Sequence, residues 1–278
     1  MNGYSPISGR HAVDQAVVGI RFHRQADDTI FRAAVELAQG LAKEYNLPGR
    51  VQLDPIALTF GKQVISHGFA GEAMLSPGLV FQRVQPSGAM AEELTLERGA
   101  VTYRTHSYLR WKDVMHLLEG IVCPVASALS SGNAEGVSVI ELRCIDKFTS
   151  ESSARLKLNR LIRRDSPFVP SIFLEKQEML HFHTGWFENE TDESRVLINL
   201  NIDVVDNPDG NRTATILQVI SKQYSENGAA FNPNLGFDEN IITNFNVLHA
   251  EDKHLLKNLI TDELQGAINL FDSGAADQ

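Results

Sequence analysis

The sequence predicts an α+β fold whose two halves share the element order β-α-β-β-β-α. Two observations lead to this prediction. Strand-like and helix-like patterns of apolar residues alternate in the same order twice, and the turn-rich stretch SSGNAEG, residues 130–136, separates the two series. We therefore expect an N-terminal α+β lobe over residues 1–132 and a C-terminal α+β lobe over residues 133–278, with one continuous domain as the alternative.

The first half opens with a β-branched run at residues 16–22, which predicts a strand. An amphipathic helix is expected at residues 29–45, and NLPG at residues 46–49 ends it. Its N-cap is expected to be one of three adjacent residues, Asp27, Asp28 or Thr29. Its helical spacing predicts a buried stripe of Ile30, Ala33, Ala34, Leu37 and Leu41.

Strand-like segments then follow at residues 50–58, 78–84 and 93–111, separated by Gly, Pro and Ser. A second helix is expected over residues 113–130. Gly120 and Pro124 should bend or interrupt it, because proline cannot donate a helical hydrogen bond.

The second half repeats this alternation. Strands are expected at residues 137–148, 178–188, 194–205 and 212–224, and DNPDGN at residues 206–211 is a strong turn signal between the last two. Helices are expected at residues 152–164, 238–245 and 249–271. The last helix should bury one apolar stripe, made of Leu255, Leu256, Leu259, Ile260, Leu264, Ala267 and Ile268.

This element order is expected when a long helix packs across one face of a curved antiparallel sheet. Folds similar to the TATA-binding protein and to helix-grip proteins have this arrangement. The duplication is a prediction from the order of the patterns alone, since the two halves share no repeat at the level of residues.

The composition bounds the class of protein. With 278 residues, of which 43% are hydrophobic, the chain can bury a large core. The formal charge of −10 repels polyanions and argues against general nucleic-acid binding. Cys123 and Cys144 form neither a C-x-x-C pair nor a disulfide framework, and no apolar run is long enough to span a bilayer. We expect a cytoplasmic protein without a membrane partner.

Several segments resemble a sporadically distributed family of bacterial cytosolic proteins of about this length. They are VVGIRF (17–22), YRTHSYLRW (103–111), VIELRCIDKF (139–148), LINLNIDVV (197–205) and the closing LHAEDKHLLKNLITDEL (248–264). The resemblance covers roughly residues 15–265 and includes no catalytic signature. It implies the patchy occurrence seen for accessory genes, mobile elements and phage-defence loci, and it transfers no site residues.

His181 and His183 suggest a metal site, because alternate residues of a strand point to the same face. We expect a hairpin that places His183 opposite Asn199 and His181 opposite Asn201. Asp203 then lies on the same face and completes a set of His181, His183 and Asp203 for zinc, iron or manganese. The alternative, which the sequence favours, is that these residues form the polar side of a half-buried sheet.

A basic cluster stands out against the acidic background. Arg155, Lys157, Arg160, Arg163 and Arg164 lie in the helix expected at residues 152–164. Such a helix could contact phosphates or an acidic partner. The more common explanation is a solvated face balanced by nearby carboxylates.

The sequence contains neither a G-x-S-x-G motif nor a phosphate-binding glycine loop. We therefore expect a non-enzymatic binding or accessory protein of a bacterial defence or mobile-element module, which recognises a partner protein or a ligand. The alternatives are a metal-dependent enzyme using His181, His183 and Asp203, and a nucleic-acid-binding protein using residues 155–164. No cofactor is predicted, a divalent metal is left open, and so is homo-oligomerisation.

Overall fold

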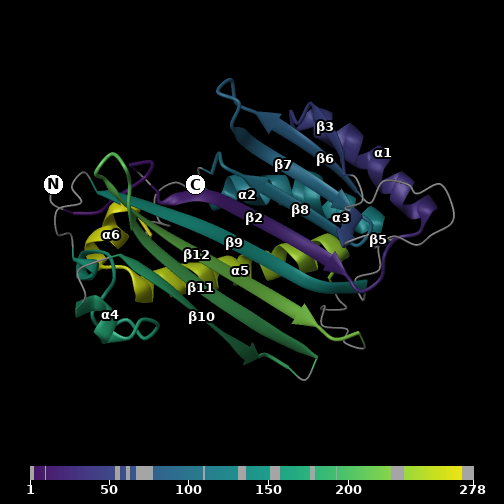
Figure 1. The fold of residues 1–278 in the computed structure, drawn as a ribbon. Helices are drawn as coiled ribbons and strands as arrows, with labels where there is room; N and C mark the ends of the chain where they lie inside the picture. Colours follow the sequence, from purple (N-terminus) through teal and green to yellow (C-terminus); the bar gives the residue numbers. More distant parts are fainter. Residues whose placement is uncertain are drawn as a thin grey trace. The chain divides into compact units, whose positions relative to one another are not determined.

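The computed structural model describes residues 3–9, 11–53, 57–60, 63–66, 78–108, 110–130, 136–150, 157–175, 179–191, 193–226 and 235–270. It confirms an α+β protein with a large antiparallel sheet and a few helices (Figure 1). The chain forms two compact units that are not consecutive in sequence. Unit 1 contains residues 1–17, 141–223 and 243–278, and unit 2 contains residues 18–140 and 224–242.

Unit 1 is built on four long strands: β9 (Val137–Ser150, in unit 1 from residue 141), β10 (Leu180–Asn189), β11 (Ser194–Asp206) and β12 (Arg212–Tyr224). Their order is β10-β11-β12-β9, and the short strand β1 (Ser5–Pro6) pairs with β9. The predicted turn between β11 and β12 is confirmed. Gly210 has a positive φ of 84° there, which a glycine adopts without steric cost.

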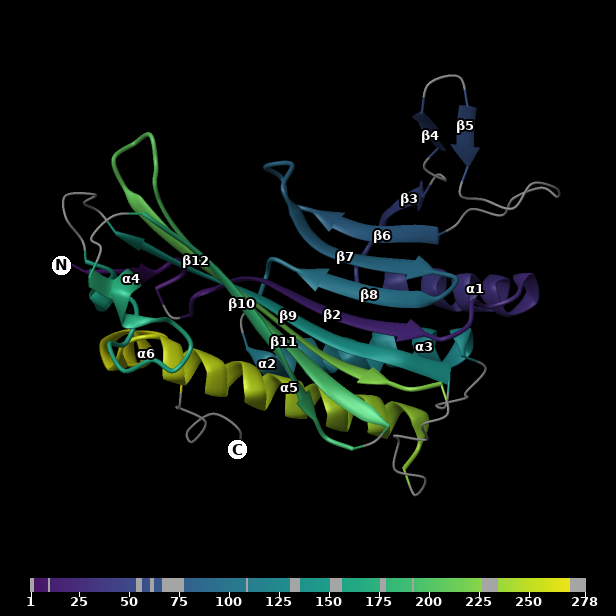
Figure 2. The same cartoon turned by 60° about the horizontal axis from the view of Figure 1, so that its bottom comes forward.

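Burial alternates along these strands, as expected for a sheet with one covered face. On β11 the buried row is Val196, Ile198, Leu200, Ile202 and Val204, and the residues between them are half-exposed. Helix α5 (Phe237–Leu259) supplies Leu256 and Leu259 to the same apolar cluster as Leu200 and Ile202. Figure 2 shows α5 running along these strands. The residues of α5 from 243 onward belong to unit 1.

The helices predicted at 238–245 and 249–271 divide differently in the structure. α5 continues through residues 246–248, and the chain breaks at Ile260 and Thr261 before α6 (Asp262–Ala267). The break has a local cause, because Ile260 forms a β-bridge with Ile162 and Thr261 donates its N–H to the Leu161 carbonyl. The predicted stripe is buried from Leu255 to Leu264, but Ala267 is exposed.

The helix predicted at residues 152–164 is wrong over its described part. Residues 157–164 contain only a short 3-10 helix, Leu158–Arg160, and the next helix is α4 (Ser171–Glu175). Leu158, Leu161 and Ile162 are fully buried, as their apolar character suggests. The backbone of this segment, however, is hydrogen-bonded to the end of α5, since the Arg163 N–H donates to the Leu259 carbonyl.

Unit 2 has strands in the order β2-β8-β7-β6-β3. Their bounds are β2 (Val13–Phe22, in unit 2 from residue 18), β3 (Gly49–Leu53), β6 (Gly78–Val84), β7 (Met90–Glu97) and β8 (Ala100–Thr105). A separate hairpin is formed by β4 (Ala57–Phe60) and β5 (Gln63–Ser66). The segment predicted as one strand region at 93–111 is therefore a tight β7–β8 hairpin followed by a helix.

Helix α1 (Asp28–Glu44) begins where the sequence predicts. The Asp27 carboxylate caps it by accepting hydrogen bonds from the N–H groups of Thr29 and Ile30. The predicted buried stripe is wrong except at Ala34. The buried face is Phe31, Ala34, Ala38 and Ala42, whereas Leu37 is exposed. Three alanines allow a close approach of the helix to its neighbours, which the larger predicted residues would prevent.

The helix predicted at residues 113–130 is interrupted, as expected from Gly120. It consists of α2 (Trp111–Leu117), a π-helix (Leu118–Val122) and α3 (Cys123–Leu129). A Cβ atom at Gly120 would overlap the hydroxyl group of Tyr45, so a larger residue there would require the Tyr45 side chain to move. Among the described residues, no helix is long and apolar enough to cross a membrane.

Candidate functional site

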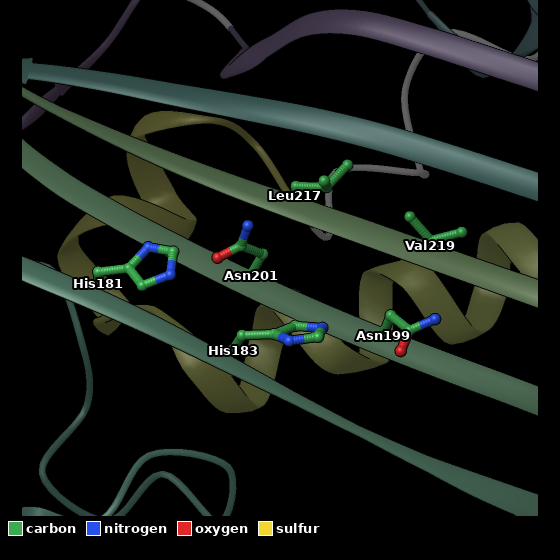
Figure 3. A pocket seen from close by; sticks show the side chains of 6 residues that line it. All are labelled: His181, His183, Asn199, Asn201, Leu217 and Val219. Atoms are coloured by element: carbon green, nitrogen blue, oxygen red, sulfur yellow. The ribbon is translucent and has the colours of Figure 1, made fainter. Parts of the chain in front are cut away.

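The candidate site lies in unit 1, on the face of the sheet opposite α5. A pocket of about 370 Å³ is lined by His181 and His183 from β10, Asn199 and Asn201 from β11, and Leu217 and Val219 from β12. Figure 3 shows the six side chains on the near side of the three strands, with a helix behind them. The pocket therefore combines two imidazoles, two amides and an aliphatic wall.

Strand alternation brings these residues together. All six have odd numbers, and their even-numbered neighbours on β11 and β12 point into the core. Gly185 gives the site part of its shape. A Cβ atom there would overlap the Asn199 side-chain oxygen and lie 3.0 Å from the Ile198 carbonyl oxygen. The absence of a side chain at Gly185 thus lets the Asn199 amide lie against β10.

The register between β10 and β11 differs from the predicted one by two residues. The structure pairs His181 with Asp203, His183 with Asn201 and Gly185 with Asn199. The predicted pairs, His183 with Asn199 and His181 with Asn201, are wrong, although the predicted face is correct. Pairing continues to Asn189 and Arg195, because the N–H groups of Glu190 and Thr191 both donate to the Ser194 carbonyl and close a short turn.

This register brings His181 and Asp203 into direct contact. Nδ1 of His181 lies 2.5 Å from a carboxylate oxygen of Asp203. A carboxylate partner places the proton on Nδ1, so Nε2 of the neutral ring is left as a hydrogen-bond acceptor. The His181 side chain is 75% exposed and Asp203 is 40% exposed. The pair therefore orients an imidazole and adds little to stability.

Asn201 lies across from His183 and between His181 and Leu217 in Figure 3. Its side-chain oxygen is shielded from solvent and has no hydrogen-bond partner among the described residues. A buried acceptor without a donor costs free energy. The Asn201 amide is thus a polar group of the pocket with unused hydrogen-bonding capacity.

The proposed metal ligands come together only in part. Asp203 contacts His181, but His183 faces the amide of Asn201 across the strands. Within the described residues, no group of three or more His, Cys, Asp or Glu side chains is placed to hold a metal ion. The arrangement can accept and donate hydrogen bonds, and His181 can accept a proton.

The basic cluster does not form a helical face in the described residues. Arg155 lies outside them, and Lys157, Arg160 and Arg164 are exposed in and beside the short 3-10 helix. Arg163 forms ion pairs with Asp165 at 3.1 Å and with Asp262 at 2.7 Å. The Arg163 charge is therefore balanced locally, as the solvated-face interpretation expects.

Sequence reasoning missed a second polar group, buried on the α5 side of the same sheet. Cys144 and Asp146 on β9, Gln218 on β12 and Asp252 on α5 all lie in the core of unit 1. The available signal was an aspartate within the apolar stripe of the last helix. Neither cysteine fits a nucleophile, since burial raises the pKa of Cys123 to about 12 and that of Cys144 well above its ordinary value.

Comparison with known proteins assigns no family. No family model and no curated protein match the sequence. Among solved structures, the chain is similar to the di-domain ARO/CYC StfQ from the steffimycin biosynthetic pathway, with 9% sequence identity and a TM-score of 0.22, covering 88% of this chain and 96% of that chain. A likeness at this level transfers neither fold nor function.

Proposed function

We propose that the protein is a binding protein, and that its site is the pocket lined by His181, His183, Asn199, Asn201, Leu217 and Val219. In this proposal the sheet of unit 1 works in a helix-grip-like way. Helix α5 covers one face, and the other face receives a small polar ligand. The observation that carries the proposal is the convergence of imidazole and amide groups beside an aliphatic wall in one pocket.

The size and chemistry of the pocket support this function. Small-molecule sites typically have volumes of about 300–1,000 Å³ and combine apolar walls with a few placed polar groups. The pocket of about 370 Å³ lies at the lower end of this range. The asparagine amides can each donate and accept, and Asp203 fixes the orientation of His181. A small ligand with both donors and acceptors fits this set.

Binding is favoured over catalysis by the residue types in the pocket. No serine, threonine or cysteine is among its six lining residues. The pocket lining thus supplies a possible general base in His181 but no hydroxyl or thiol nucleophile of its own. The family resemblance extends the proposal to an accessory role in a bacterial defence or mobile-element module, in which the liganded protein is recognised by a partner protein.

A fragment screen tests the proposal. Side-chain amide signals of Asn199 and Asn201 are followed by NMR while small heteroaromatic, amide and carboxylate fragments are added. We expect fragments that shift both amide signals. Asn201→Ala should weaken the affinity of these fragments by about tenfold, which corresponds to one lost hydrogen bond of about 1.4 kcal/mol. Thr215→Ala is the matched control, because Thr215 shares this face of β12 but does not line the pocket.

Two results would contradict the proposal. One is a screen in which no fragment moves the signals of Asn199 and Asn201. The other is a set of bound fragments whose affinity falls equally in Asn201→Ala and Thr215→Ala, since binding would then not depend on the pocket amides.

A further inference from the structure

A buried polar cluster lies behind the wall of the pocket. It consists of Cys144, Asp146, Gln218 and Asp252, which are at most 7% exposed, and Gln218 is fully buried. These residues come from β9, β12 and α5, so the cluster joins the helix to the sheet. Polar groups buried this deeply need hydrogen-bond partners or protons to offset the loss of water.

The cluster has more acceptors than donors. The Gln218 side-chain amide donates a hydrogen bond to a carboxylate oxygen of Asp146 over 3.4 Å. The carbonyl oxygen of the same amide and one carboxyl oxygen of Asp252 have no partner among the described residues. A proton carried by one of the two carboxyl groups supplies a donor that this arrangement otherwise lacks.

The electrostatic surroundings also favour a bound proton. The side chains that affect the pKa of Asp252 are Asp146, the Cys144 thiol and Glu251, and the one that affects the pKa of Asp146 is Gln218. None of these groups is a cation that could offset a carboxylate charge. Burial raises the pKa of Asp146 to about 7, and burial together with the neighbouring Asp146 raises the pKa of Asp252 well above its ordinary value. Two like charges in a dry interior repel strongly.

β12 connects this cluster to the pocket. Gln218 lies between Leu217 and Val219, and these two residues line the pocket on the other face of the strand. A movement of the Gln218 backbone that relieves repulsion in the core therefore moves the aliphatic wall of the pocket. β9, which carries Cys144 and Asp146, contributes no residue to the pocket lining.

We propose that the cluster of Cys144, Asp146, Gln218 and Asp252 is a proton-binding site that controls the shape of the pocket through β12. Loss of the Asp146 proton leaves a carboxylate with one hydrogen bond in the dry interior beside the Asp252 carboxyl group, and the strand that carries Gln218 shifts. This inference rests on the proposed function, because it concerns the same pocket. It predicts that ligand binding depends on pH through the protonation of the buried cluster.

NMR of the full chain tests the proposal without a ligand. The methyl signals of Leu217 and Val219 and the carboxyl carbon signals of Asp146 and Asp252 are followed from about pH 5 to about pH 9, the range in which a carboxyl group with a strongly raised pKa titrates. The background is a His181→Gln, His183→Gln double variant, so that a change in the methyl signals cannot come from the two imidazoles of the pocket.

We expect the methyl signals to move with the same midpoint as the Asp146 carboxyl carbon. The transition should disappear in Asp146→Asn and persist in Glu263→Gln, an exposed carboxylate of α6. Asp252→Asn serves as a second variant should Asp146→Asn fail to fold. Three results would overturn the proposal: carboxyl carbons that do not titrate in this range, methyl signals that stay still while they do, or an unchanged methyl transition in both variants. Because the titration needs no ligand, a negative result can be distinguished from a failed fragment screen.

Discussion

Replacing Asp146 with asparagine should remove the contribution of this carboxyl group to the pH dependence of the stability of unit 1. The asparagine side chain has nearly the shape of the aspartate and keeps an amide partner in Gln218, but it cannot become charged in the core. The wild-type carboxyl group is 2% exposed and accepts one hydrogen bond from Gln218. Its ionised form is therefore poorly solvated, and the folded state holds the proton more tightly than the unfolded chain does.

The magnitude follows from the two pKa values of Asp146. The ordinary value is 3.8, and burial raises the value in the folded protein to about 7. The difference of about 3 pKa units sets an upper limit of about 4 kcal/mol, because Asp252 titrates together with Asp146. Because the folded pKa is the higher one, this contribution to stability is fully present below about pH 4 and is lost as the pH rises through about 7.

Urea unfolding at several pH values measures this effect. The fluorescence of Trp186 in a Trp111→Phe background reports unit 1, since Trp186 stacks on Phe168 there. At about pH 8, Asp146→Asn should be more stable than the wild type by up to about 4 kcal/mol, and near pH 4 the two should agree closely. The exposed control Glu263→Gln should follow the wild-type curve. Parallel curves for Asp146→Asn and wild type across this range would refute the reasoning.

Three further predictions concern packing and metal content. Gly120→Ala should destabilise unit 2 by about 1–3 kcal/mol in thermal unfolding, because its Cβ atom overlaps the Tyr45 hydroxyl and the ring carbon that carries it; the same change should cost less in a Tyr45→Ala background, and an equal cost would contradict this contact. Phe245→Ala should cost about 3–5 kcal/mol in urea unfolding, since Phe245 is fully buried, whereas half-exposed Val247 on the same helix should tolerate alanine within about 1 kcal/mol. Protein purified without a nickel step should contain less than about a tenth of an equivalent of zinc, iron or manganese by elemental analysis, and a stoichiometric amount would favour the metal hypothesis instead.

The strands and their faces could be predicted from the sequence because alternation is a local property. The predicted segments 194–205 and 212–224 lie within one residue of β11 and β12 at each end, and the turn between them is where DNPDGN indicates. The shared face of His181 and His183 also follows from alternation alone. These features need only neighbouring residues, so tertiary structure does not alter them.

The register of β10 and β11 could not be predicted with the same certainty, because it depends on how the turn closes. Hydrogen bonds from residues 190 and 191 to Ser194 shorten the loop and move the pairing by two residues. The short 3-10 helix at Leu158–Arg160 has a similar cause. The apolar residues were correctly expected to be buried, but the end of α5 takes the backbone bonds that a helix would have used. Both outcomes depend on partners that the local sequence does not specify.

The buried pair of Asp146 and Asp252 shows a different limit of prediction from the sequence. Asp146 lies on a strand in which apolar and polar residues alternate, and Asp252 lies between polar neighbours on a helix far away in sequence. Either one alone resembles an ordinary polar residue on a half-buried element, and only the packing of α5 on the sheet places the two together. A buried charge is expensive unless it is paired or protonated, so the fold itself makes these two carboxyl groups interdependent.

The His181–Asp203 pair is the feature that the binding and metal hypotheses explain differently. In many metal sites a carboxylate bonded to one ring nitrogen orients a histidine whose other nitrogen binds the metal. Such a site needs at least two further protein ligands around that nitrogen. Next to His181 the pocket offers the imidazole of His183, and its remaining polar groups are the amides of Asn199 and Asn201. Amides are poor ligands for zinc but ordinary hydrogen-bond partners. The pair is therefore better explained as the support of an imidazole that hydrogen-bonds a ligand than as part of a metal centre.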